Sequence, residues 1–319
     1  MLKLACLILT AWSSIHQVNA QGKAVPFCKN EYEKTPKNCG KFQFTVKKAN
    51  CKLDEKLTRE FYNIEKWSAA KISPRAKKYA EIITNVFENG DEIFGYAACE
   101  KLNDGRGFTC GRIGFTSGTG DALTVLQKYE GIAPRSALSK YIPTLKKIDT
   151  LAQCDSRRDN TNELVGFDKA WIKTSCQDPR FNRIQDQIND GMYFIPALKF
   201  AQKMGIQSNL GKAIFYDTII QHGWQMNEAD INLVKILTVT GKRGYMTEKQ
   251  YLEKFLKTRR QLLCCYPDDT WPPSADRVAD LQAVIKKGDM NLSRPIYLPN
   301  YGVRVTGKEI TNTPGPQCK

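Results

Sequence analysis

The stretch NDGRGFTCGRIGFTSGTGD, residues 103–121, holds six glycines and two aspartates in nineteen residues. Glycine weakens helices and strands, so this density predicts turns and close backbone approaches rather than long regular elements. We expect a small β-hairpin region near residues 93–116. A dinucleotide site or a P-loop is excluded, because no GxGxxG opens a helix after a strand and no GK[ST] follows.

Helical periodicity appears on both sides of this stretch. Before it, apolar residues recur at the i, i+3, i+4 spacing of a buried helical face: Tyr79, Ile82, Ile83, Val86 and Phe87. Asn89-Gly90 then predicts the end of that helix. After the stretch we expect a helix capped by Thr119 or Asp121, and further helices at residues 180–188, 196–205, 211–223 and from Thr247, where Gln250 completes a capping box. The tail after Pro267 is rich in proline and is predicted to be irregular, so the expected fold class is mainly α (α+β).

The first twenty residues have the pattern of a secretory signal peptide. Lys3 supplies a positive charge, residues 4–12 form a short apolar run, and small residues end the segment at position 20. The run is too short to span a membrane, and no later apolar run approaches that length. We therefore expect a signal peptide at 1–20, a Cys/Lys-rich extension at 21–70 and the main domain at 71–319. The protein is expected to be secreted, extracellular and monomeric, with no membrane partner.

Cysteine usage supports an oxidising compartment. Of eleven cysteines, Cys6 lies in the leader, and an even number in a secreted chain predicts up to five disulfides of unreadable pairing. Zinc fits less well, because no CxxC pair occurs and His222 is the only histidine after the leader. We expect neither a metal nor a cofactor.

The formal net charge is +15. Such a charge favours anionic partners such as sulfated glycans or bacterial surfaces, although scattered lysines also serve solubility. No stripe of basic residues interleaved with aromatic residues occurs, so a nucleic-acid partner is not expected.

Two carboxylates have settings suited to chemistry. Glu88 ends its helix after an apolar pair, where the negative end of the helix dipole disfavours a charged carboxylate, as a general acid requires. Asp104 lies in a polar turn, where a carboxylate stays solvated and ionised. Two carboxyl groups in such different environments are typical of glycoside hydrolysis, although each residue alone fits an ordinary surface role. Cys99 and Cys110 flank Asp104 and are placed to pin the hairpin by a disulfide.

The sequence resembles the glycoside hydrolase family 46 endo-chitosanases. The resemblance lies in FENG at residues 87–90 and DGRGFTCGRIGFTSGTGD at residues 104–121, with weaker similarity in order at residues 141–148, 193–205, 215–223 and 251–259. It covers about residues 75 to 300 and leaves the N-terminal extension unaccounted for. It implies a two-lobed, lysozyme-like fold with a substrate cleft between the lobes.

By the same resemblance the chain would be an inverting endo-acting hydrolase of β-1,4 glucosamine linkages in chitosan. Glu88 would be the general acid, with Glu92 and Glu100 as alternatives, and Asp104 the general base, acting on a water held by Thr109. Four further residues are implied to bind the substrate: Arg106, Asp121, Tyr193 and His222. Asp121 serves equally well as a helix cap.

Asp217 interrupts an apolar run, and Arg259 lies on the inward face of its helix. A buried charge needs a partner, so we expect these two residues to pair. The resemblance implies that such an arginine ties the catalytic carboxylates into an ion network, whereas a packing-only pair is the alternative. Two other functions remain open: a lysozyme-like peptidoglycan hydrolase, which a basic surface would suit, and a non-catalytic secreted glycan-binding protein.

Overall fold

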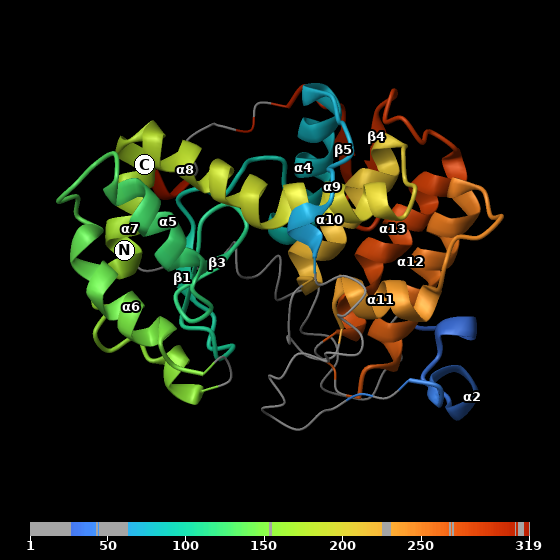
Figure 1. The fold of residues 1–319 in the computed structure, drawn as a ribbon, viewed down its shortest axis with the longest axis horizontal. Coiled ribbons are helices and arrows are strands. Elements are labelled where there is room, and N and C mark those ends of the chain that lie inside the picture. Colours follow the sequence, from blue (N-terminus) through green and yellow to red (C-terminus); the bar gives the residue numbers. More distant parts are fainter. Residues whose placement is uncertain are drawn as a thin grey trace.

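The computed structural model describes residues 27–42, 44, 63–152, 155–224, 231–267, 269, 271–309, 311 and 316–318. The expected signal peptide lies outside this part of the chain, as does much of the extension. The fold is mainly α with small antiparallel sheets, which confirms the predicted fold class (Figure 1).

The molecule has two lobes, each with its own buried apolar cluster (Figure 1). The smaller lobe, on the left of Figure 1, is built from β1 (Cys99–Lys101), β2 (Phe108–Cys110), β3 (Phe115–Thr116), α5 (Asp121–Glu130), α6 (Ile142–Asp149), α7 (Phe167–Gln177) and α8 (Pro179–Asn189). The larger lobe contains α4 (Pro74–Asn89), α9 (Ile195–Lys203), α10 (Asn209–His222), α11 (Leu233–Thr240), α12 (Glu248–Cys265), α13 (Ala275–Lys287), β4 (Ile296–Leu298) and β5 (Val303–Val305).

One nearly continuous helical run joins the lobes. It consists of α8, a π-helical turn at Asp190–Phe194 and α9 (Figure 1). Tyr193, in the π-helical turn, packs against the apolar clusters of both lobes. Single π-helical turns are rare and often occur at functional sites. This run therefore sets how the two lobes meet.

Helix α4 forms for the reasons that its sequence suggests. Ser73 caps it by accepting a hydrogen bond from the backbone N–H of Ala76 at 3.2 Å, and Pro74 follows at the first helical position. Gly90 ends it in the left-handed conformation, with φ of 81°, as predicted. The predicted apolar face is buried in the large lobe. Glu88 is thereby fixed in the last turn.

Two local predictions were wrong. The tail after Pro267 contains α13 and the β4–β5 hairpin, because Val278, Leu281 and Ile285 recur at helical spacing and outweigh the nearby prolines. The cap of α5 is Gly120, in the left-handed conformation, rather than Thr119 or Asp121. The predicted capping box at Thr247 and Gln250 is confirmed.

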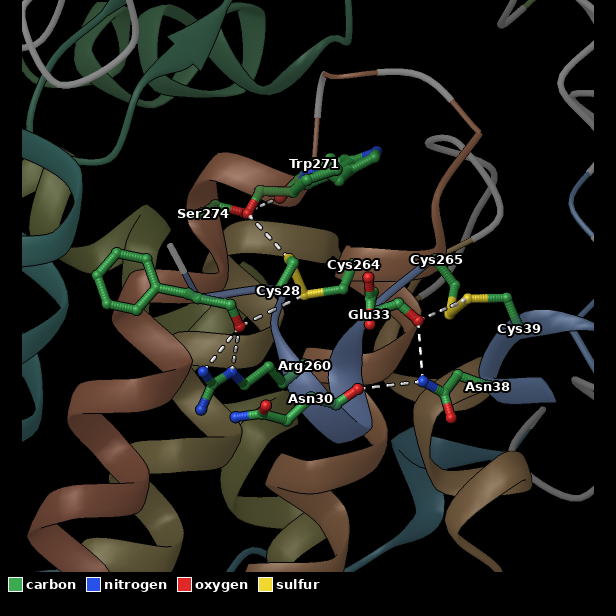
Figure 2. The surroundings of a disulfide bond; sticks show 12 residues. Cys28, Asn30, Glu33, Asn38, Cys39, Arg260, Cys264, Cys265, Trp271 and Ser274 are labelled. Atoms are coloured by element: carbon green, nitrogen blue, oxygen red, sulfur yellow. Dashed lines mark hydrogen bonds between the residues drawn. A yellow bond between two sulfur atoms is a disulfide. The ribbon is translucent and has the colours of Figure 1, made fainter. Parts of the chain in front are cut away.

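Disulfides attach the N-terminal segment to the large lobe. Cys28 pairs with Cys264 and Cys39 pairs with Cys265, so two adjacent residues of α12 hold α2 (Pro36–Cys39) and the chain before it (Figure 2). Arg260 adds two hydrogen bonds to the carbonyl oxygen of Phe27, at 3.0 and 2.7 Å. Residues 27–42 are therefore attached to the large lobe by two disulfides and by the hydrogen bonds of Arg260.

Two more disulfides act on the small lobe. Cys99 and Cys110 face each other across β1 and β2 and are bonded, which confirms the predicted pin of the hairpin. Cys176 on α7 pairs with Cys318, which anchors the end of the chain to the small lobe after it has left the β4–β5 hairpin. Cys51 and Cys154 lie outside the described residues.

Candidate active site

Glu88 projects from the last turn of α4, in the large lobe. Its carboxylate accepts a hydrogen bond from Nη1 of Arg277 at 2.7 Å, and 29% of the side chain stays exposed. Phe87 lies under the same guanidinium, with 5.2 Å between its ring centre and Cζ of Arg277. The carboxylate is therefore held in one orientation while its outer side remains accessible.

Asp104 lies in the β1–β2 loop of the small lobe. Arg106 binds it through Nη2 at 2.7 Å and Nε at 2.9 Å, and the backbone N–H of Arg106 donates to Oδ1 at 3.1 Å. The fork of a guanidinium fits a carboxylate in this geometry. With 27% of its side chain exposed, Asp104 keeps access to solvent.

The loop is held in place by close backbone packing. Gly118 donates its N–H to the carbonyl oxygen of Arg106 at 2.9 Å. A Cβ at Gly118 would lie 2.7 Å from that oxygen and 2.9 Å from the carbonyl oxygen of Arg158, so only glycine fits. The glycine-rich motif thus brings two backbone segments together beside Asp104.

Thr109 lies on β2, opposite Glu100 on β1 and Thr116 on β3. Its hydroxyl oxygen is buried and makes no hydrogen bond to any described residue. A buried hydroxyl without a partner is costly, and such groups often have a functional role.

A chain of buried ion pairs runs inward from Glu88. Arg277 binds Glu88 through one nitrogen and Oδ1 of Asp217 through the other, at 2.5 Å. Oδ2 of Asp217 accepts from Nη1 of Arg259 at 2.7 Å, and both of these side chains are fully buried. The predicted Asp217–Arg259 pair is confirmed, and it is connected to Glu88 rather than isolated.

Electrostatics favour the ionised form of Asp217. Burial alone would raise its pKa, but the guanidinium groups of Arg277 and Arg259 outweigh burial and hold the pKa below its ordinary value. Asp217 therefore balances two buried positive charges, which lets Arg277 face the carboxylate of Glu88.

Sequence reasoning missed Arg277. It shares the buried face of α13 with Leu281 and Val284, which is the same signal that singled out Arg259 on α12. Because the prolines of this region led to an irregular prediction, the helical face was not considered. A helical reading of residues 275–287 would have exposed a second charged residue on an inward face.

Asp121 is the first residue of α5, and its two carboxylate oxygens make different contacts. Its Oδ1 accepts hydrogen bonds from the N–H groups of Thr116 and Ala122 and from the hydroxyl of Thr119, so it shapes the start of α5. Its Oδ2 accepts from the hydroxyl of Tyr193 at 3.2 Å. Burial raises the pKa of Asp121, and these hydrogen bonds oppose the rise. The pair joins the small lobe to the π-helical turn.

His222 lies in the interior, which does not fit the predicted contact with a substrate. It is fully buried and packs against Trp271, with ring centres 4.9 Å apart. Burial holds its pKa well below the ordinary value, and the nearby charges of Arg259 and Arg277 act in the same direction. His222 is therefore neutral and lies buried near the two arginines of the ion chain.

The structure divides the predicted residues into three groups. Glu88, Asp217 and Arg259 form one connected chain, Asp104 and Arg106 form a local pair, and Asp121 and Tyr193 bind each other. Glu100, an alternative acid, lies on the exposed side of β1.

A small recess lies where the lobes meet beside Glu88, and Arg112 of the small lobe and Tyr216 of α10 are among its lining residues. Within the described part of the chain, no cluster of histidine, cysteine, aspartate and glutamate side chains is suited to a metal ion. The described residues also contain no helix of the length and apolarity needed to cross a membrane.

Comparisons with known proteins show which family the chain belongs to. The family model for glycosyl hydrolase family 46 matches residues 82–296. A chitosanase of Bacillus subtilis (strain 168) is 38% identical over 239 residues, which is 72% of this chain and 84% of the relative. A chitosanase of Streptomyces sp. (strain N174) is 32% identical over 72% of this chain and 81% of its own length.

Solved structures show the same fold. A mutant chitosanase from Bacillus subtilis MY002, complexed with 6 GlcN, has a TM-score of 0.66 at 34% identity and covers 75% of this chain and 100% of its own. A family 46 chitosanase from Gynuella sunshinyii, in complex with chitotetraose, has a TM-score of 0.65 at 32% identity, with coverage of 74% and 98%. The lysozyme-like fold that was predicted is confirmed. The chain belongs to glycosyl hydrolase family 46 and is a glycoside hydrolase.

Proposed function

We propose that the chain is a secreted, endo-acting and monomeric chitosanase that hydrolyses β-1,4 glucosamine linkages with inversion of the anomeric configuration. The observation that carries the proposal is that two differently held carboxylates, Glu88 and Asp104, come from opposite lobes. The relatives support the substrate, because they are chitosanases and two solved ones contain glucosamine oligosaccharides.

In the proposed mechanism each of the two carboxyls makes one proton transfer. The carboxyl of Glu88 donates its proton to the glycosidic oxygen as the bond to the anomeric carbon breaks. Asp104 takes a proton from a water whose oxygen attacks that carbon from the opposite face, and the hydroxyl of Thr109 orients this water. Arg277 and Arg106 keep the two carboxyls aimed at the sugar.

The substrate must meet locally acidic surface, since chitosan is a polycation and the chain carries a net charge of +15. Asp121, which accepts a hydrogen bond from Tyr193, would supply negative charge for a glucosamine ammonium near the junction of the lobes. Four disulfides among the described residues support secretion, because disulfides persist in oxidising compartments. Recovery of the protein from the medium, with Gln21 as its first residue, would test the signal peptide.

The central test uses Glu88→Gln and Asp104→Asn. Each variant should lose at least about a hundredfold in release of reducing ends from chitosan while keeping the wild-type circular dichroism spectrum. Proton NMR of the products at early times should show the α anomer. Wild-type rates in either variant, or β products, would refute the assignment. Bacterial cell walls and chitin as parallel substrates would expose a peptidoglycan or chitin hydrolase instead.

A further inference from the structure

Arg112 is a buried arginine that the mechanism above does not use. It lies in the turn between β2 and β3 of the small lobe, and only 3% of its side chain is exposed. Arg112 stands two residues after Cys110, the last residue of β2, and three residues before Phe115, the first residue of β3. Arg112 therefore follows directly on β2, the strand that carries Thr109, whereas the loop with Asp104 precedes that strand.

The guanidinium of Arg112 reaches across the junction between the lobes. Nη2 lies 3.4 Å from Oε1 of Glu81, and Nη1 bonds Oδ1 of Asp186 on α8. The ring of Phe94 covers its face, with 3.9 Å between Cζ and the ring centre. Burying this charge costs several kcal/mol before pairing, so stability alone gives little reason for it.

Glu81 and Glu88 lie on one helix. They are seven residues apart on α4, which is about two turns, so both face the same side. Arg112 and Glu88 also line the same recess between the lobes. Lys77 extends the contact, since it binds Glu81 at 2.9 Å and Asp190 of the π-helical turn at 2.8 Å.

We propose that Arg112 is a positioning residue that sets the spacing between the Glu88 and Asp104 carboxyls by tying the β1–β3 sheet to α4. Inversion needs a separation of about 6.5–9.5 Å, so that a water fits between the base and the sugar. The two carboxyls stand on separate lobes, and the Arg112–Glu81 pair directly joins the elements that carry them. The inference rests on the proposed function.

The first test compares Arg112→Met with Arg112→Lys. Methionine keeps the bulk and removes the charge, so kcat on chitosan should fall about tenfold to a hundredfold with KM within threefold, because small misplacements of reacting groups are costly. Lysine keeps one charge and should recover part of kcat. Arg260→Met is the matched control: it removes another arginine that stacks on an aromatic ring, Tyr32, but whose bonds stay within the large lobe. It should lower Tm and leave kcat within twofold.

Arg112→Met leaves Glu81 buried without this partner, so Glu81→Leu and the double variant complete the experiment. Each single variant removes the same Arg112–Glu81 ion pair. The kcat of the double variant should therefore fall no more than about threefold below that of either single variant. Losses that multiply, a loss expressed only in KM, or a folded Arg112→Met with kcat within twofold of wild type would overturn the proposal. Absence of wild-type chitosan hydrolysis would instead refute the proposed function.

Discussion

Neutralising Asp217 should lower the Tm of the protein. It should also weaken the contact by which Arg277 orients Glu88. Asp217→Asn keeps the shape of the side chain but leaves Arg259 and Arg277 buried beside each other with one negative charge fewer. Breaking a buried ion pair typically costs about 3–5 kcal/mol. For a chain of this size, each kcal/mol lowers Tm by roughly 2–4 °C, so we expect a decrease of about 6–20 °C.

Thermal unfolding followed by circular dichroism gives the measurement, and Glu163→Gln gives the control. Glu163 pairs with Lys147 at 3.1 Å, but 58% and 72% of these side chains are exposed. An exposed pair is worth only about 0–1 kcal/mol, so the control should lose at most about 4 °C. Equal decreases in Tm in the two variants would refute the conclusion that the buried ion pair of Asp217 contributes more to stability than an exposed ion pair does.

The pH dependence gives a second readout of the same variant. The pKa of Asp217 is depressed in the folded protein, so its contribution to stability is complete above the unfolded value of about 3.9. It is lost as pH falls through the folded pKa. The difference in Tm between wild type and Asp217→Asn should therefore shrink below about pH 4. A difference that stays constant into strong acid would contradict this electrostatic origin.

Three other changes test separate parts of the structure. Burial raises the pKa of Asp280 to about 7, so its ionisation should destabilise the fold as pH rises from about 4 to about 7. Asp280→Asn should therefore reduce the decrease in Tm over this pH range. An unchanged slope of Tm against pH would contradict the prediction. Thr109→Val should lower kcat about tenfold to a hundredfold with Tm within about 2 °C, since the hydroxyl makes no bond to the described protein; a large loss of Tm would show a structural role. The double variant Cys28→Ser, Cys39→Ser should lower the free energy of unfolding in urea by about 2–5 kcal/mol, because each disulfide closes a long loop. Its kcat at 25 °C should stay unchanged. A lower kcat would show that the N-terminal segment affects catalysis.

The parts of the site that were predicted from sequence are those with local signals. Glu88 follows an apolar helical face and precedes a glycine stop, and Asp104 sits in a polar turn of the same motif. The Asp217–Arg259 pair was predicted because each charge interrupts an apolar pattern, and the structure confirms it. The positions of these charged residues show in the local sequence pattern, whereas the catalytic roles of Glu88 and Asp104 rest on the family resemblance.

The missed parts depend on contacts between distant elements. Arg112 stands inside the motif, but its partners lie on α4 and α8 and become adjacent only when the lobes pack. The interior position of His222 follows from packing against Trp271 on a separate segment. Neither relationship leaves a periodic pattern in the sequence.

The two carboxyls that we propose as catalytic therefore differ in where the groups that orient them lie in the sequence. Asp104 is oriented by Arg106, two residues away, so its geometry is contained in the motif itself. Glu88 is oriented by Arg277, 189 residues away, and Arg277 in turn depends on Asp217 and Arg259. Substitutions that displace α10, α12 or α13 should thus change the orientation of Glu88 more than that of Asp104. The short motif contains the group that orients Asp104, whereas the groups that orient Glu88 come from three helices of the large lobe.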